Sequence, residues 1–185
     1  MPIQPGTYRL GPDNSTLSVR TGRTGAAAMA GHNLLFHVTA WEATLVVGDA
    51  PAATTLELTA DGASLHVIEG TGGMQALGDD DKVDIRRTVD DDVLKREGVT
   101  FRSTAVQPSA DGSGLSVLGD LTLRGTTRPI TFDVTVDGAG KLAASAVLKQ
   151  TDWKIKPYSA LFGALKVVDE VEVAIDATLS AAQSR

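Results

Sequence analysis

Residues 115–136 carry the pattern that most constrains how this chain can fold. Apolar and polar side chains alternate over residues 115–123 and again over residues 130–136, with a break around Gly125. This alternation, with one apolar face, is typical of an antiparallel strand that is half-buried. Two such strands separated by a glycine-containing break indicate a β-hairpin. Pro129 stands at the entry of the second strand, where a missing N–H does least harm.

Similar short segments recur along most of the chain. Further strands are expected over residues 7–10, 15–21, 34–47, 54–59, 64–69, 99–107, 142–149 and 171–179. Asp61-Gly62, between two of them, is a strong hairpin signal. Residues 80–94 differ, because an acidic start precedes apolar positions spaced at about 3.6 residues, which predicts a helix. Residues 151–168 are expected to form a long ordered loop, and residues 180–185 a frayed tail.

Nine or ten closely spaced strands and one helix within 185 residues predict a single all-β domain, either a barrel or a sandwich. A closed barrel of about eight strands can hold one small ligand inside. Several residues expected to face the interior are small and would leave space in a barrel: Ala43, Ser103, Gly119, Ala144 and Ala146. The alternative is that inward side chains simply fill the core at normal density.

Composition narrows the classes of function. The formal net charge of −6 argues against a nucleic-acid groove or an anionic membrane surface as the main partner. The chain has no cysteine, which excludes disulfides and thiolate metal sites. No stretch approaches the ~20 apolar residues of a membrane span. Because the N-terminal residues also lack the basic start and apolar run of a signal peptide, we expect a soluble, cytoplasmic protein.

The order of these signals resembles the YceI-like family of lipocalin-like, polyisoprenoid-binding proteins. The matching segments follow one another along nearly the whole chain: Gly6-Thr7-Tyr8, Asn14-Ser15-Thr16, Gly31-His32, and residues 99–104, 119–129, 150–153 and 169–171. The resemblance implies one domain over residues 1–185, an extended antiparallel, lipocalin-like β-barrel with one α-helix packed beside it. It also implies that a long isoprenoid chain binds in the barrel lumen. Residues 64–94 depart from the pattern, with Gly-Gly and an acidic run where the family often carries an Arg-Asp pair.

Our first hypothesis is therefore a carrier, not an enzyme, that binds an isoprenoid or quinone-like lipid without a cofactor. Apolar pockets with few polar groups suit a lipid tail. The candidate ligand-binding residues are expected to line the lumen or its mouth: Leu17, Val19, Phe36, Trp41, Leu45, Leu58, Val67, Phe101, Leu121, Phe132, Trp153, Leu161, Phe162 and Val173. Three of these, Trp153, Leu161 and Phe162, lie with Tyr158 in an aromatic-rich segment that either closes over a ligand or plugs the barrel.

Arg86 and Arg87 are candidates for contacting a pyrophosphate head group, because the arginine fork matches phosphate oxygens. The other interpretation is a surface salt bridge with the nearby aspartates. His32 and His37 are five residues apart, on opposite faces of a regular strand, and His66 is the only other histidine, so we expect no metal site.

The sequence contains no Gly-x-Ser-x-Gly elbow, so a hydrolase of that design is not expected. The alternative function is a stress-related protein-interaction module that uses the Gly-rich residues 70–73 and the acidic helix. Exposed edge strands of an antiparallel sheet favour a homodimer.

Overall fold

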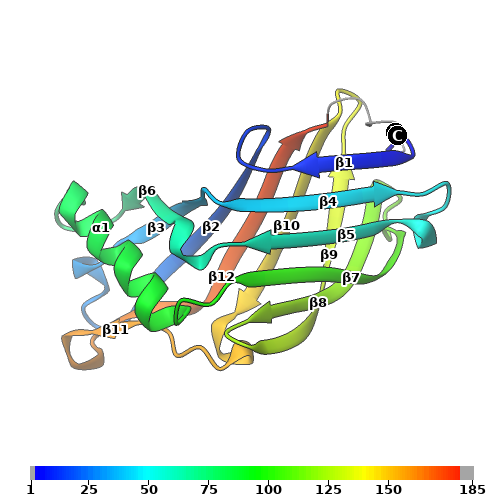
Figure 1. The fold of residues 1–185 in the computed structure, drawn as a ribbon. Helices are drawn as coiled ribbons and strands as arrows, with labels where there is room; N and C mark the ends of the chain where they lie inside the picture. The colour runs from blue at the N-terminus through cyan, green and yellow to red at the C-terminus, as the bar shows by residue number, and fades with distance from the viewer. Residues whose placement is uncertain (1–2, 180–185) are drawn as a thin grey trace.

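The computed structural model describes residues 3–179, which form one antiparallel sheet that curls around a central space (Figure 1). The strands are β1 (Gly6–Leu10), β2 (Ser15–Thr24), β3 (Asn33–Val38), β4 (Trp41–Val47), β5 (Thr55–Ala60), β6 (Leu65–Thr71), β7 (Val99–Pro108), β8 (Gly114–Leu123), β9 (Thr126–Val136), β10 (Lys141–Lys149), β11 (Ser159–Ala160) and β12 (Leu165–Thr178). The expected tail at residues 180–185 lies outside the described part.

Across the sheet the strands follow the order β1-β4-β5-β7-β8-β9-β10-β12-β2-β3-β6, and the short β11 pairs with β12. β1 and β6 are the two edges, and within residues 3–179 they do not pair with each other. The expected barrel is therefore confirmed as a curled antiparallel half-barrel.

The hairpin of residues 115–136 is confirmed as β8 and β9. Their antiparallel pairing runs up to Leu123 and Thr126, which leaves Arg124 and Gly125 as the turn. These two residues have φ values of 48° and 66°. A two-residue type I′ turn requires positive φ at both positions, and glycine adopts it without strain.

The single strand expected over residues 34–47 is wrong, because the chain forms two strands there. β3 lies between β2 and β6, whereas β4 lies between β1 and β5 in a distant part of the sheet. The change of direction falls at Thr39 and Ala40, whose N–H groups donate to the carbonyl and the hydroxyl of Ser64, both at 3.0 Å. Both strands carry inward apolar residues, so their alternation does not show where one ends.

The hairpin expected at Asp61-Gly62 is also wrong. β5 pairs with β4 and β7, and β6 pairs with β3. The Asp61 carboxylate instead accepts a hydrogen bond from the Ala63 N–H at 2.9 Å and begins the 3₁₀ turn η3 (Gly62–Ser64). Gly62 packs closely against Leu94, since a Cβ there would lie 2.8 Å from the Leu94 Cδ1. The Asp-Gly pair thus marks a change of direction without strand pairing.

The helix expected over residues 80–94 is confirmed in position as α1 (Asp79–Thr88), which continues as the π-helical turn η4 (Val89–Val93). Asp81 accepts a hydrogen bond from the Gly78 N–H at 2.9 Å. Aspartates in the first turn and arginines in the last turn both complement the helix dipole. α1 packs beside β6 at one end of the curled sheet (Figure 1). The long loop expected at 151–168 contains two 3₁₀ turns and β11, and β12 begins within it at Leu165.

The interior of the sheet has a packed end and a hollow end. The packed end consists of buried side chains in mutual contact: Tyr8, Leu10, Trp41, Ala43, Leu45, Val47, Val106, Val117, Val134, Leu142 and Ala177. Val117 and Leu45 are only 1% and 2% exposed. Toward α1, inward residues such as Phe132 and Val173 stay partly exposed, because a cavity lies beside them. The fold therefore places open space at the α1 end.

The turn between β7 and β8 gives a testable pH dependence. Asp111 accepts hydrogen bonds from the Ser113 N–H and from the hydroxyls of Ser113 and Ser109, which lower its pKa from 3.8 to about 2. Ionised Asp111 therefore stabilises the fold above its ordinary pKa, and this contribution is lost as the pH falls to about 2. We expect Asp111→Asn to flatten the fall in melting temperature across that interval. Melting curves followed by circular dichroism measure it, and an unchanged slope would contradict the assignment.

Candidate functional site

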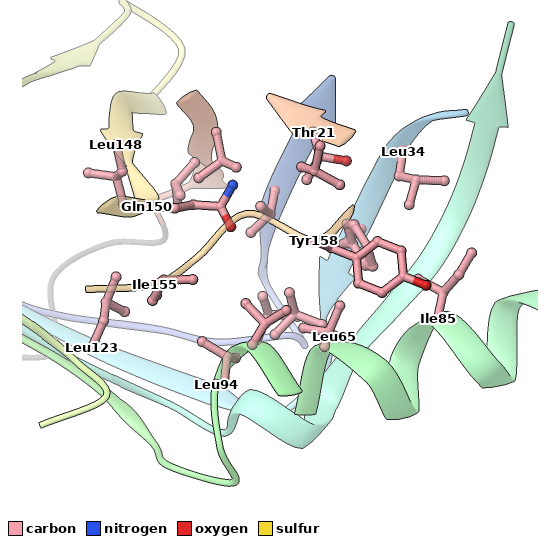
Figure 2. Close-up of a pocket in the computed structure, with 18 of the residues that line it drawn as sticks. Thr21, Leu34, Leu65, Ile85, Leu94, Leu123, Leu148, Gln150, Ile155 and Tyr158 are labelled. Carbon is pink, nitrogen blue, oxygen red and sulfur yellow. The ribbon is translucent and has the colours of Figure 1, made fainter. Parts of the chain in front are cut away.

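A cavity of about 840 Å³ lies between the curled sheet and α1 (Figure 2). Inward side chains of β2, β3, β5, β7–β10 and β12 form its wall, with α1 and η4 along one side and residues 74–77 at its rim. Protein interiors contain few voids larger than a water molecule. Ligand pockets measure roughly 300–1,000 Å³, so this space has the size of a binding site.

The wall is mostly aliphatic and aromatic. The rings of Phe101 and Phe132 pack with centroids 5.4 Å apart and a tilt of 56°. Gly119 makes room for this pair, since a Cβ there would lie 2.4 Å from the Phe101 ring. β10 contributes Ala144 and Ala146, whose short side chains leave the cavity wide on that side. A cavity of this character suits an apolar ligand rather than a charged one.

Nine of the fourteen apolar residues predicted from the sequence lie on the cavity wall: Leu17, Val19, Phe36, Leu58, Phe101, Leu121, Phe132, Trp153 and Val173. Two others, Trp41 and Leu45, belong to the packed end. Val67 is buried on β6 without reaching the cavity. Leu161 and Phe162 lie on the protein surface, where they are 55% and 113% exposed.

The aromatic-rich segment divides into a half that enters the barrel and a half that stays outside. Trp153, in the 3₁₀ turn η5 (Gln150–Trp153), is 3% exposed, and its Nε1–H donates to the Leu121 carbonyl at 3.0 Å. Ile155 is equally buried and also lines the cavity. Tyr158 lies over the cavity with its hydroxyl directed toward α1 (Figure 2). The first half therefore plugs the barrel, and Tyr158 covers the opening.

Gln150 is the buried polar group of the cavity wall. It is 9% exposed, and its Nε2 donates to the Val168 carbonyl at 3.0 Å, which fixes the orientation of the amide. The amide extends into the cavity (Figure 2), and within the described residues its Oε1 accepts no hydrogen bond. An unpaired acceptor that is accessible from the cavity matches a ligand group that donates an O–H or N–H. Sequence reasoning missed Gln150 because no pattern distinguishes it at the end of a strand.

Arg86 and Arg87 do not line the cavity. The Arg86 Nε–H donates to the Ala63 carbonyl at 2.8 Å, which ties α1 to η3. Arg87 lies 3.3 Å from the Asp84 carboxylate on the exposed face of the helix. The salt-bridge interpretation thus describes Arg87, and neither side chain is placed to meet a head group inside the cavity.

The Gly-rich residues 70–73 end β6 and lead into residues 74–77, which line the cavity. The His32 Nε2–H donates to the Gln75 carbonyl at 2.7 Å. Arg23 donates from Nη1 to the carbonyls of Ala28 and Gly31, which anchors the 3₁₀ turn η1 (Ala28–Ala30) beside it. These bonds hold the rim of the cavity in place from β2 and from His32, which directly precedes β3.

No group of three or more histidine and acidic side chains within residues 3–179 is placed to hold a metal ion. His37 and His66 stand opposite each other on β3 and β6. None of the helices described here is long and apolar enough to cross a membrane.

A curled antiparallel sheet around an apolar cavity defines a lipocalin-like binding protein of barrel fold. The family model described as the YceI-like domain matches residues 8–179. Because this match spans nearly the whole chain, the protein belongs to the YceI-like family.

Individual relatives agree with this assignment. Two UPF0312 proteins of Pseudomonas putida, from strains F1 and W619, are 44% and 46% identical over 50 residues, which is 27% of this chain and 26% of theirs. The match therefore spans about a quarter of the curated relatives. The crystal structure of Burkholderia cenocepacia BcnA gives a TM-score of 0.62 at 19% identity, over 88% of this chain and 94% of that chain. The Campylobacter jejuni YceI protein gives 0.58 at 16% identity, over 80% and 84%. At these identities the structures support the fold alone.

Proposed function

We propose that this protein is a binding and carrier protein that holds a long-chain apolar ligand, an isoprenoid or a quinone-like lipid, in the cavity. The observation that carries the proposal is a space of about 840 Å³ lined mainly by aliphatic and aromatic side chains. Each CH₂ group transferred from water into such a space gains about 0.8 kcal/mol. A long hydrocarbon tail therefore has a large driving force to enter, and no reacting group is needed to retain it.

The nine predicted residues on the cavity wall are proposed contacts of the tail. Those on β7 and those on the neighbouring strands β12 and β2 line it from different parts of the curled sheet, so a bound chain is enclosed along its length. Gln150 offers the ligand an acceptor at the cavity wall, and the proposed ligand therefore carries a hydroxyl or another donor, as a polyprenol or a quinol does.

Native mass spectrometry of protein purified gently from its own host, followed by lipid extraction, tests the function. The expected result is a bound species with a long apolar tail that is released on denaturation. A protein that arrives empty and takes up neither polyprenols nor fatty acids in a titration would overturn the proposal. That outcome would favour the alternative function, a protein-interaction module that uses residues 70–73 and α1.

The proposed role of Gln150 gives a sharper prediction. Gln150→Leu keeps a similar side-chain size and removes the acceptor, so a polyprenol is expected to bind about tenfold more weakly, the value of roughly one hydrogen bond. The methyl ether of the same polyprenol has no O–H to donate and is the matched control ligand. Because loss of the Gln150 bond to Val168 affects both ligands alike, the ratio of the two dissociation constants isolates the head-group contact. An unchanged ratio in a fluorescence titration would remove Gln150 from the ligand site.

A further inference from the structure

Apolar side chains are exposed together beside the cavity opening. We name this set the mouth patch, which consists of Met29 (71% exposed), Tyr158 (48%), Leu161 (55%) and Phe162 (113%). The two segments that carry it are joined by a hydrogen bond of 2.8 Å from the Ala27 N–H to the Ala164 carbonyl. Tyr158 also lines the cavity, so the patch is continuous with the binding site.

The backbone holds this patch outward. Leu161 and Phe162 have φ values of 52° and 55°, in the left-handed region that non-glycine residues seldom adopt. The Ala164 N–H donates to the Leu161 carbonyl at 3.1 Å, and the Val167 N–H donates to the Tyr158 carbonyl at 2.9 Å. Such strain persists where the surrounding structure imposes it, and it concentrates at functional sites. The backbone conformation and its hydrogen bonds therefore hold Phe162 in an exposed position.

Positive charge accompanies the patch. Residues 153–168 include Lys154, Lys156 and Lys166 and no acidic residue, although the whole chain has a net charge of −6. All three lysines are exposed. The acidic helix α1 borders the same cavity, and the Tyr158 hydroxyl is directed toward it (Figure 2). The rim near β11 thus has a charge opposite to that of the molecule as a whole.

We propose that the mouth patch and these lysines dock the protein on the surface of an anionic lipid bilayer, with the cavity opening turned toward the lipid. Exposed aromatic and aliphatic side chains enter the interface between head groups and acyl chains, and lysines beside them are attracted to anionic lipids. Tyrosine suits this boundary because one end of its ring is apolar and the other is polar. Loading of a ligand from the bilayer rests on the proposed function, whereas the docking itself does not.

Sedimentation with vesicles tests the docking. The full chain is mixed with vesicles of phosphatidylcholine alone or of an equimolar mixture with phosphatidylglycerol, and binding is expected on the anionic vesicles. The double variant Leu161→Ser/Phe162→Ser is expected to bind roughly tenfold more weakly or worse, since two exposed apolar side chains no longer enter the interface. Val147→Ser is the matched control, because Val147 is 68% exposed on β10 and lies outside the mouth patch.

The contribution of the lysines to vesicle binding can be tested separately. Lys156→Gln is expected to weaken binding to the anionic vesicles about fivefold, the contribution of one lysine near such a surface. This difference should shrink as salt is added. On phosphatidylcholine alone the variant should match the unchanged protein.

Several outcomes would overturn the proposal. The unchanged protein could stay in the supernatant with anionic vesicles, or Val147→Ser could weaken binding as much as the double variant does. Light scattering could show a dimer that the double variant converts to a monomer, which would make the patch an interface between copies. A titration with a fluorescent fatty acid in solution, without vesicles, keeps the two proposals apart. Vesicle binding without uptake of this probe or of a polyprenol would remove the carrier function and leave the docking.

Discussion

Leu45→Ala is expected to lower the free energy of unfolding by roughly 2–5 kcal/mol and to leave ligand binding unchanged. Leu45 is 2% exposed at the packed end, where it stands opposite Tyr8 on β1 and Leu56 on β5. Truncation removes buried methyl groups and leaves a void that the paired strands can close only in part. Urea unfolding followed by circular dichroism measures the change.

Leu118→Ala is the matched control, because it removes the same atoms from a side chain of β8 that is 40% exposed. That change should stay within about 0.5 kcal/mol. Equal midpoints for the Leu45 and Leu118 variants would show that the packed end does not stabilise the fold. A loss of ligand binding at unchanged stability would instead place Leu45 in the site.

The position of Leu45 also shows what sequence alternation can and cannot predict. Period-two patterning correctly assigns which face of a strand points inward, as it does for both Leu45 and Val173. It does not give the depth of a residue along the curled sheet. Depth decides that Leu45 packs against neighbours whereas Val173 borders open space. The face of the sheet was thus predictable, but the division between packed and hollow ends was not.

Strand order was less predictable than strand position. The β8–β9 hairpin follows from local signals, since its turn and both alternating strands lie within one short segment. β3 and β4 are adjacent in sequence, yet each pairs with different partners elsewhere in the sheet. Those pairings depend on contacts between residues far apart in the chain, which a local pattern does not contain.

The candidate site also depends on individual residues whose role does not show in the strand pattern or in the net charge of the whole chain. Gln150 is a single polar residue whose importance comes from its burial and its free acceptor. The net charge of −6 argues against an anionic surface as the main partner, but it says nothing of the three lysines gathered near β11. These lysines and Phe162 lie in one short segment of the sequence, and only the fold shows that this segment borders the cavity opening.

The double substitution Ala144→Phe/Ala146→Phe is expected to abolish binding of a long-chain ligand without weakening the fold. Both alanines border the cavity on β10, opposite Ile175 and Val173 of β12. Two phenyl rings there occupy the space that the proposed ligand tail needs. Overpacking a filled core costs about 1–3 kcal/mol, whereas filling an open cavity commonly raises stability by about 0.5–2 kcal/mol.

Ala143→Phe is the control for the double variant, because Ala143 is exposed on the outer face of the same strand. It adds a phenyl ring and should leave the titration with a fluorescent fatty acid unchanged. If the double variant still binds this probe as tightly as the unchanged protein does, the cavity is not the ligand site. If it unfolds at lower urea concentration, the space beside β10 is already filled. We expect the double variant to lose ligand binding and keep its stability, and Leu45→Ala to lose stability and keep ligand binding. These two results together would show that the two ends of the sheet have separate roles.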